Sequence, residues 1–222
     1  MPLNAFQSGS PFGHKPRVKL LQLLSCLIFL FATGTSAVSM TLPDAIGITW
    51  GTPLAQFRHM NVPIEEEWPI WDQAIAVRTG SLQIQLTNTG SLIMVFHQKH
   101  GLIKMHWASL PIQRDITGSK GIEAFNEVKA QLMATFGLSS LSKEETNVQL
   151  HGFYGDFYEC LQETTCGKWE SIWETTEGEA VILELIGLDS GAGYLQMTHQ
   201  GPNLDKILQH GHWKSIEPKN EI

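Results

Sequence analysis

Apolar and polar residues alternate along the first part of the chain, and this period of two predicts strands. The alternation covers residues 82–86 and 103–108, while residues 91–96 form a mostly apolar strand run and residues 72–78 a weaker strand. Turn residues separate these segments at Asn88-Thr-Gly90 and His100-Gly101. The pattern therefore predicts an antiparallel meander of three or four strands.

Two segments carry helix signals instead. Thr52 and Pro53 predict the N-cap and first position of a short helix that ends before Pro63. A longer helix is expected from Ser119, its predicted N-cap, to Gly137, its predicted C-cap. Between these ends, apolar residues recur on one helical face: Ile122, Phe125, Val128, Leu132 and Phe136.

More strands are expected after the long helix. They are predicted at 148–158, 168–174, 180–186 and 194–199, followed by a helical turn at 204–209. The order predicts an α+β fold: antiparallel sheet or sheets, with one short and one long helix packed on one side. Its αβββ–αβββ rhythm suggests a pseudo-duplication, without a residue-level repeat. Since no Pro- or Gly/Ser-rich linker divides the halves, residues 38–222 are expected to form a single domain, with 203–222 partly a frayed tail.

The N-terminus has the layout of a secretory signal. Lys15, Arg17 and Lys19 precede an apolar run at 20–32, and small residues follow at 33–37. This predicts a signal peptide over residues 1–37, cleaved after Ala37, and an exported protein, periplasmic or secreted. A retained N-terminal membrane anchor is the alternative, because extending the run to Met40 reaches a marginal span.

Composition narrows the function classes. The 222 residues include 22 acidic and 15 basic ones, for a net charge of −7. Cleavage of the signal removes three positive charges and leaves −10. This acidic surface would repel a phosphate backbone, so nucleic acid is not expected as a partner. An apolar fraction of 42% also argues against intrinsic disorder.

Two cysteines remain after the signal, Cys160 and Cys166. In an oxidising compartment such a pair is expected to form a disulfide that closes a small loop. A metal or redox dithiol is the alternative, but the spacing is not C-x-x-C and there is no second pair.

The remaining reactive residues do not assemble a catalytic motif. Ser81 and Ser91 lack the second glycine of a nucleophile elbow, and the glycine-rich stretch 187–193 fits a hairpin turn better than a phosphate loop. His97 and His100 are expected to point to opposite faces of a strand, which argues against a zinc site. We predict no catalytic residues, no metal and no cofactor.

Five acidic residues in the second half have spacings typical of a solvated strand face: Glu170, Glu174, Glu177, Glu179 and Glu184. A glycosidase-like pair among them is the alternative, because paired acids meet in space and not in sequence.

The segment 65–72 is the predicted binding site. Glu65, Glu66 and Glu67 precede Trp68 and Trp71, and exposed indoles beside that charge could hold a cationic or carbohydrate partner. The alternative is that one or both indoles cap the core under a loop. A separate set of tryptophans is expected in the core or as packing anchors: Trp50, Trp107, Trp169 and Trp173.

Two stretches carry a resemblance to a class of proteins. Ile48-Thr-Trp-Gly-Thr-Pro-Leu-Ala-Gln-Phe57 and the residues Gly101-Leu-Ile-Lys, Phe125 and Leu132-Met-Ala-Thr-Phe-Gly137 resemble small exported bacterial envelope proteins of unknown function. The resemblance covers residues 48–137. It implies an envelope setting and an α+β fold, and it carries no catalytic residues.

These observations favour an exported, non-enzymatic binding or envelope-associated module. Its partner would be a protein or a small molecule, with a cationic partner as one candidate, and no membrane span would remain after signal cleavage. One alternative is a secreted hydrolase whose site assembles only in the fold. Another is an inhibitor or immunity-type protein that blocks a basic groove with its acidic surface.

Overall fold

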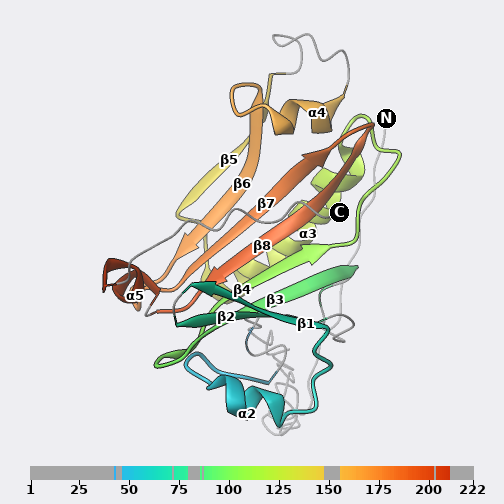
Figure 1. The fold of residues 1–222 in the computed structure, drawn as a ribbon. Helices are drawn as coiled ribbons and strands as arrows, with labels where there is room; N and C mark the ends of the chain where they lie inside the picture. The colour runs from blue at the N-terminus through green and yellow to red at the C-terminus, as the bar shows by residue number, and fades with distance from the viewer. Residues whose placement is uncertain are drawn as a thin grey trace, which may run out of the picture. The chain divides into compact units, whose positions relative to one another are not determined.

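One antiparallel sheet of eight strands organises the part of the chain that the structure, a computed structural model, describes (Figure 1). That part comprises residues 43, 47–71, 73–79, 86, 88–147, 156–202 and 204–210, all within the compact unit Ala37–Ile222. The predicted signal peptide, most of the predicted strand at 82–86, and residues 211–222 lie outside it.

The strands form two meanders that meet in the middle of the sheet. The strands are β1 (Glu66–Trp71), β2 (Ala74–Thr79), β3 (Thr89–His97), β4 (Gly101–Ser109), β5 (Leu141–Thr146), β6 (Gly167–Glu174), β7 (Ala180–Leu188) and β8 (Ala192–Gln200). Their order is β1-β2-β3-β4-β8-β7-β6-β5, so β4 and β8 join the halves. A helix precedes four strands in each half, and in the second half a further short helix separates β5 from β6, so the predicted rhythm is present only approximately.

Three of the described helices cover one face of this sheet. They are α2 (Leu54–Arg58), α3 (Ser119–Phe136) and α4 (Phe157–Gln162). Helix α3 buries Phe125, Val128 and Leu132 against the strands, as the predicted helical face requires. The α+β fold with one short and one long helix on one side is therefore confirmed. A further short helix, α5 (Leu204–His210), packs on the opposite face and confirms the helical turn expected at 204–209.

The tryptophans expected in the core lie on the helix-covered face. Trp107 and Trp173 are fully buried there, and Trp169 packs half-buried beside them. Trp50 meets the buried ring of His199 edge-on at 4.8 Å between centroids, which fits its expected role as a packing anchor.

Two predicted N-caps were wrong by one residue. The N-cap of α2 is Pro53, and the hydroxyl of Thr52 donates instead to the carbonyl of Thr49 at 2.8 Å. The N-cap of α3 is Gly118, whose φ of 75° suits glycine. The predicted C-cap of α3 at Gly137 is confirmed.

Two strands were missed and one was misplaced. Strand β1 has no clean alternation, contains Pro69 and forms one edge of the sheet, where proline is tolerated. Strand β5, at the other edge, is almost entirely polar, so no apolar period marks it. Phe157 and Tyr158, expected at the end of a strand, begin helix α4, while residues 148–155 lie outside the described residues.

The side chain of Asp156 decides the start of α4, because it accepts hydrogen bonds from the backbone N–H groups of Tyr158 and Glu159. The predicted disulfide closes the loop after this helix. Cys160 and Cys166 are bonded, both buried, and connect α4 to the start of β6. Among the described residues, none of the helices has the length and apolar character needed to span a bilayer.

Candidate binding face

The strand residues that point away from α2, α3 and α4 make up what we call the open face of the sheet. Directly opposite residues of an antiparallel pair share a face, so the register identifies them. The open face contains Glu66, Trp68, Trp71, Ala74, Ala76, Arg78, Ser91, Ile93, Val95, His97, Lys104, His106, Ala108, Leu141, Lys143, Glu145, Lys168, Glu170, Ile172, Glu174, Ala180, Ile182, Glu184, Ile186, Leu188, Ala192, Tyr194, Gln196, Thr198 and Gln200.

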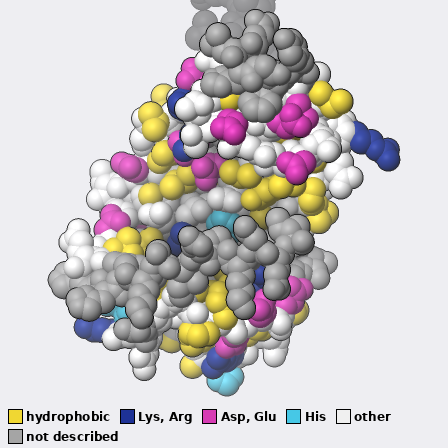
Figure 2. Space-filling view, turned by 45° about the horizontal axis from the view of Figure 1, so that its top comes forward, with side chains coloured by type: hydrophobic (Ala, Val, Ile, Leu, Met, Phe, Trp, Pro, Cys, Tyr) yellow, Lys and Arg dark blue, Asp and Glu magenta, His cyan; other side chains and the backbone are white. Residues whose placement is uncertain are grey.

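Apolar side chains are unusually frequent on this face. Strand β7 presents Ala180, Ile182, Glu184, Ile186 and Leu188 to it, all of them half-buried. A strand face that is exposed only to water normally carries polar residues. Four of the five β7 residues on this face are apolar, so solvent exposure alone does not account for its composition. Figure 2 shows hydrophobic side chains gathered beside acidic ones on the visible surface. Apolar patches rimmed by charge are typical of binding surfaces.

Helix α5 covers one end of the open face. Leu204 and Ile207 pack against Ala74, Val95 and Ile103. This small cluster fixes α5 beside β2, β3 and β4 and leaves the open-face residues of β6 and β7 outside its contacts.

Two carboxyl groups meet in the half of the open face built from β6, β7 and β8. Glu170 and Glu184 are directly opposite each other, and Lys168 Nζ lies 2.7 Å from Glu170 Oε2 and 3.9 Å from Glu184 Oε1. Gln196 donates to Glu184. Burial, and then the charge of Glu170, raise the pKa of Glu184.

The expectation that all five acidic residues are solvated is therefore wrong for Glu170, which is only 8% exposed, and for the half-buried Glu184. Their spacing in sequence carries no signal of this contact, because the register of β6 on β7 creates it. Lys168 and Gln196 occupy the oxygens of the pair. These contacts fix two carboxyl groups and one ammonium group in defined positions on the open face.

A second polar group lies near the middle of the sheet. His106 Nδ1 and Thr198 Oγ1 are 3.2 Å apart across β4 and β8. Burial, and then the nearby charge of Lys104, lower the pKa of His106 to about 4. Burial also lowers the pKa of Lys104. The imidazole is therefore neutral at pH 7.

The segment predicted to bind a partner divides between the two faces. Glu66 and Trp68 lie on the open face, whereas Glu67 points to the opposite side and pairs with Arg58. Glu66 pairs with Arg78 at 3.1 Å, and the Arg78 guanidinium lies 5.4 Å from the centroid of Trp68.

The two indoles of this segment have different surroundings. Trp71 packs with α5 in the cluster at the end of the open face, as the core-capping alternative expected. Trp68 remains half-buried at the edge of the sheet. Glu65 is exposed and donates its backbone N–H to the carbonyl of Arg78. Of the predicted site, the structure brings Glu66 and Trp68 together on the open face.

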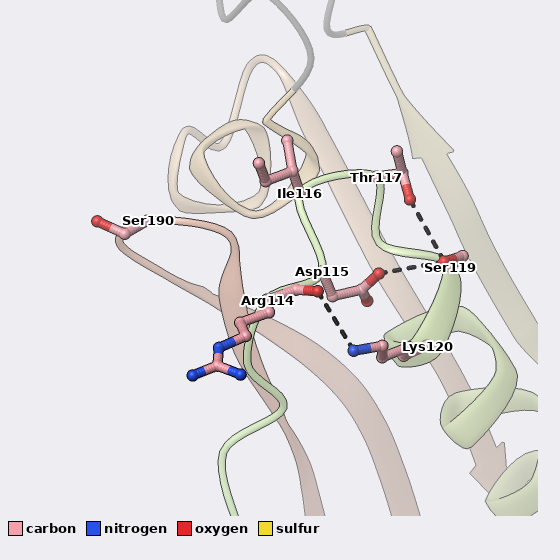
Figure 3. A pocket seen from close by; sticks show the side chains of 7 residues that line it. All are labelled: Arg114, Asp115, Ile116, Thr117, Ser119, Lys120 and Ser190. Carbon is pink, nitrogen blue, oxygen red and sulfur yellow. Dashed lines mark hydrogen bonds between the residues drawn. The ribbon is translucent and has the colours of Figure 1, made fainter.

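A pocket of about 510 Å³ lies at the start of α3, away from this face (Figure 3). Its polar groups mostly satisfy one another. The Asp115 carboxylate accepts from Gly121 N–H at 3.0 Å, from Ser119 Oγ at 3.1 Å and from Tyr158 Oη at 2.8 Å. Lys120 Nζ donates to the carbonyl of Arg114. This arrangement caps the helix and ties it to α4.

The histidines differ from expectation at one point. His97 and His100 do not diverge: their rings are 4.9 Å apart, because His100 lies in the turn after β3 rather than in the strand. His97 Nδ1 accepts from the backbone N–H groups of Lys99 and His100, so this nitrogen is already used. Within the described ranges, no three His, Cys, Asp or Glu side chains converge as metal ligands.

Sequence reasoning missed Lys104, His106 and the carboxyl pair as members of one surface. The alternation in β4 indicated that Lys104 and His106 share a face, but nothing in it identified β8 as the neighbouring strand.

Comparison with known proteins adds no relative: no protein-family model, curated protein or solved structure matches this chain. The resemblance to exported envelope proteins therefore stays a prediction.

Proposed function

We propose that this protein is an exported, non-enzymatic binding module that holds a protein partner against the open face of its sheet. The observation that carries the proposal is the apolar character of β7 toward the side without α2, α3 and α4. Ile182, Ile186 and Leu188 contribute to no described core cluster, yet they replace the polar residues that a solvated strand would present.

A protein fits this face better than a small molecule. The apolar side chains are spread over β3, β6 and β7 rather than gathered in a cavity, and small-molecule sites are normally concave. Charged groups lie among them, as at protein interfaces, where polar groups set orientation and specificity. The inhibitor or immunity-type alternative is the same geometry with an enzyme as the partner.

The carboxyl pair is the observation that favours the runner-up, a hydrolase. Glu170 and Glu184 face each other, and one of them has a raised pKa, as acid–base catalysis requires. Lys168 and Gln196 already engage these oxygens, and the pocket at the start of α3 does not include the pair. We therefore favour binding.

Site-specific photo-crosslinking tests the proposal. A photo-reactive phenylalanine analogue is placed at Ile182 on the open face and, as the control, at the exposed Glu127 on α3. We expect one discrete protein adduct from position 182 in intact cells and none from position 127. The crosslinked partner is then identified, purified and titrated against the wild-type protein and Ile182→Lys, which should bind at least tenfold more weakly while keeping its circular dichroism spectrum.

Four results would overturn the proposal. The first three are the absence of an adduct at position 182, an equal adduct at position 127, and equal affinity of the purified partner for Ile182→Lys. An adduct with a second copy of this chain would also count against it, because the proposal requires a different protein.

A further inference from the structure

Lys104 is a half-buried charged residue of the open face for which the described structure provides no ion-pair partner. It is half-buried on β4, opposite Val95 on one side and Gln200 on the other. Among the described residues, no carboxylate lies within ion-pair distance of its ammonium group. Burial of an ammonium group without a counter-ion costs free energy, and proteins normally pair such groups.

Most carboxylates of the open face are paired elsewhere, and the exposed Glu174 is separated from Lys104 by strands β7 and β8. Glu66 pairs with Arg78, Glu145 pairs with Lys143, and Glu170 and Glu184 share Lys168. The residues directly opposite Lys104, Val95 and Gln200, are neutral, and His106, two residues along β4, bonds with Thr198 and stays uncharged at pH 7. The middle of the sheet therefore carries one positive charge within an otherwise neutral and partly apolar surface.

We propose that the partner protein places a carboxylate, from an aspartate or glutamate flanked by apolar residues, against the ammonium group of Lys104. The inference rests on the proposed function, since it assumes that a protein occupies the open face. The apolar flanks would cover Ile93 and Ile182, which lie on either side of the His106–Thr198 pair in the row next to Lys104, and the carboxylate would supply the counter-ion that Lys104 lacks. Charge complementarity of this kind fixes the register of an interface.

Peptide selection tests the inference while the partner protein is still unidentified. Random twelve-residue peptides displayed on phage are selected on the purified, immobilised protein. Binders are then synthesised in pairs that differ by Asp→Asn or Glu→Gln, and their affinities are measured by fluorescence anisotropy. Four proteins are compared: wild type, Lys104→Met, Lys104→Arg and, as a matched control, Lys99→Met, which removes an exposed lysine from the β3–β4 turn.

We expect selected peptides to contain an acidic residue between apolar ones. Removal of that carboxylate should weaken binding at least tenfold to wild type and to Lys99→Met, but less than twofold to Lys104→Met. Lys104→Arg should retain most of the dependence on the carboxylate, because it keeps the positive charge. A lysine that only extends into water would give equal losses in all four proteins, and this result would overturn the inference.

Ile182→Lys separates failure of the inference from failure of the proposed function. If peptides lose binding to Ile182→Lys but do not depend on a carboxylate or on Lys104, the open face binds protein and the inference is wrong. If peptide binding is unaffected by Ile182→Lys, the proposed function fails. A tenfold gain in peptide affinity in the full-length variant Glu217→Gln/Glu221→Gln would assign the carboxylate to the chain's own C-terminal segment and would also overturn the inference.

Discussion

The two faces of the sheet are made by the same strands and yet serve different purposes. In β7, Leu183 points to the helix-covered face and is fully buried, whereas its neighbour Ile182 points to the open face and is half-buried. On the covered side, the buried carboxylate of Asp115 is satisfied internally by hydrogen bonds from Tyr158, Gly121 and Ser119. On the open face, Lys104 has no described counter-ion. Apolar character alone therefore does not separate residues that stabilise the fold from residues available to a partner.

The largest expected effect separates Leu183 from Ile182. Leu183→Ala removes a fully buried side chain from the main core and should lower the free energy of unfolding by about 2–5 kcal/mol. Ile182→Ala should cost about 1 kcal/mol, because its side chain is only partly removed from water. Urea unfolding followed by tryptophan fluorescence gives both values. Equal losses for the two variants would contradict the distinction between the faces.

A smaller effect concerns the pH dependence contributed by the open face. The pKa of His106 is lowered to about 4 in the folded chain. In the unfolded chain this ring takes up a proton near pH 6.5, whereas in the folded chain it stays neutral until the pH is near 4. This contribution to stability is complete above pH 6.5 and is lost as pH falls toward 4. We expect a loss of about 1–2 kcal/mol, less than the full shift implies, because the ring is partly exposed.

Replacement of this histidine isolates that contribution. In His106→Gln, the free energy of unfolding should fall less between pH 6.5 and pH 4 than in wild type, while the exposed His59→Gln control should follow wild type. If both variants retain the wild-type slope, His106 does not titrate as its burial requires.

The smallest effect tests the carboxyl pair. The folded pKa of Glu184 is raised by burial and by Glu170, so its charged form disfavours folding at pH 7. Glu184→Gln should therefore raise the free energy of unfolding by about 0.5–1 kcal/mol at pH 7. The gain should disappear as pH falls below the unfolded pKa of about 4.3, where both states hold the proton. Glu174→Gln, an exposed change on β6, serves as the control. A gain independent of pH would contradict this assignment.

Much of the fold follows from local patterns. The period of 3.6 residues marks α3, a mostly apolar run marks β3, and alternation marks β4, β6, β7 and β8, because these elements pack one face on the core. The missed strands, β1 and β5, are both edges of the sheet. An edge strand buries too little on either face to impose an apolar period on its sequence.

Only part of the segment predicted to bind a partner lies on the open face. Trp68 and Glu66 belong to the open face, but Trp71 supports α5 and Glu67 faces the other way. A bulge between Pro69 and Trp71 changes the register, so simple alternation along this segment could not assign its side chains to faces.

The sequence by itself determined the α+β class, the extent of the long helix, the disulfide partners and the side chains that share a face within each central strand. Those features depend on residues close together in the chain. Only the tertiary structure decided that β4 lies beside β8 and that Glu170 meets Glu184, and only it left Lys104 without a described counter-ion. These features arise from strand order and register, which join residues far apart in sequence through backbone hydrogen bonds common to every residue type.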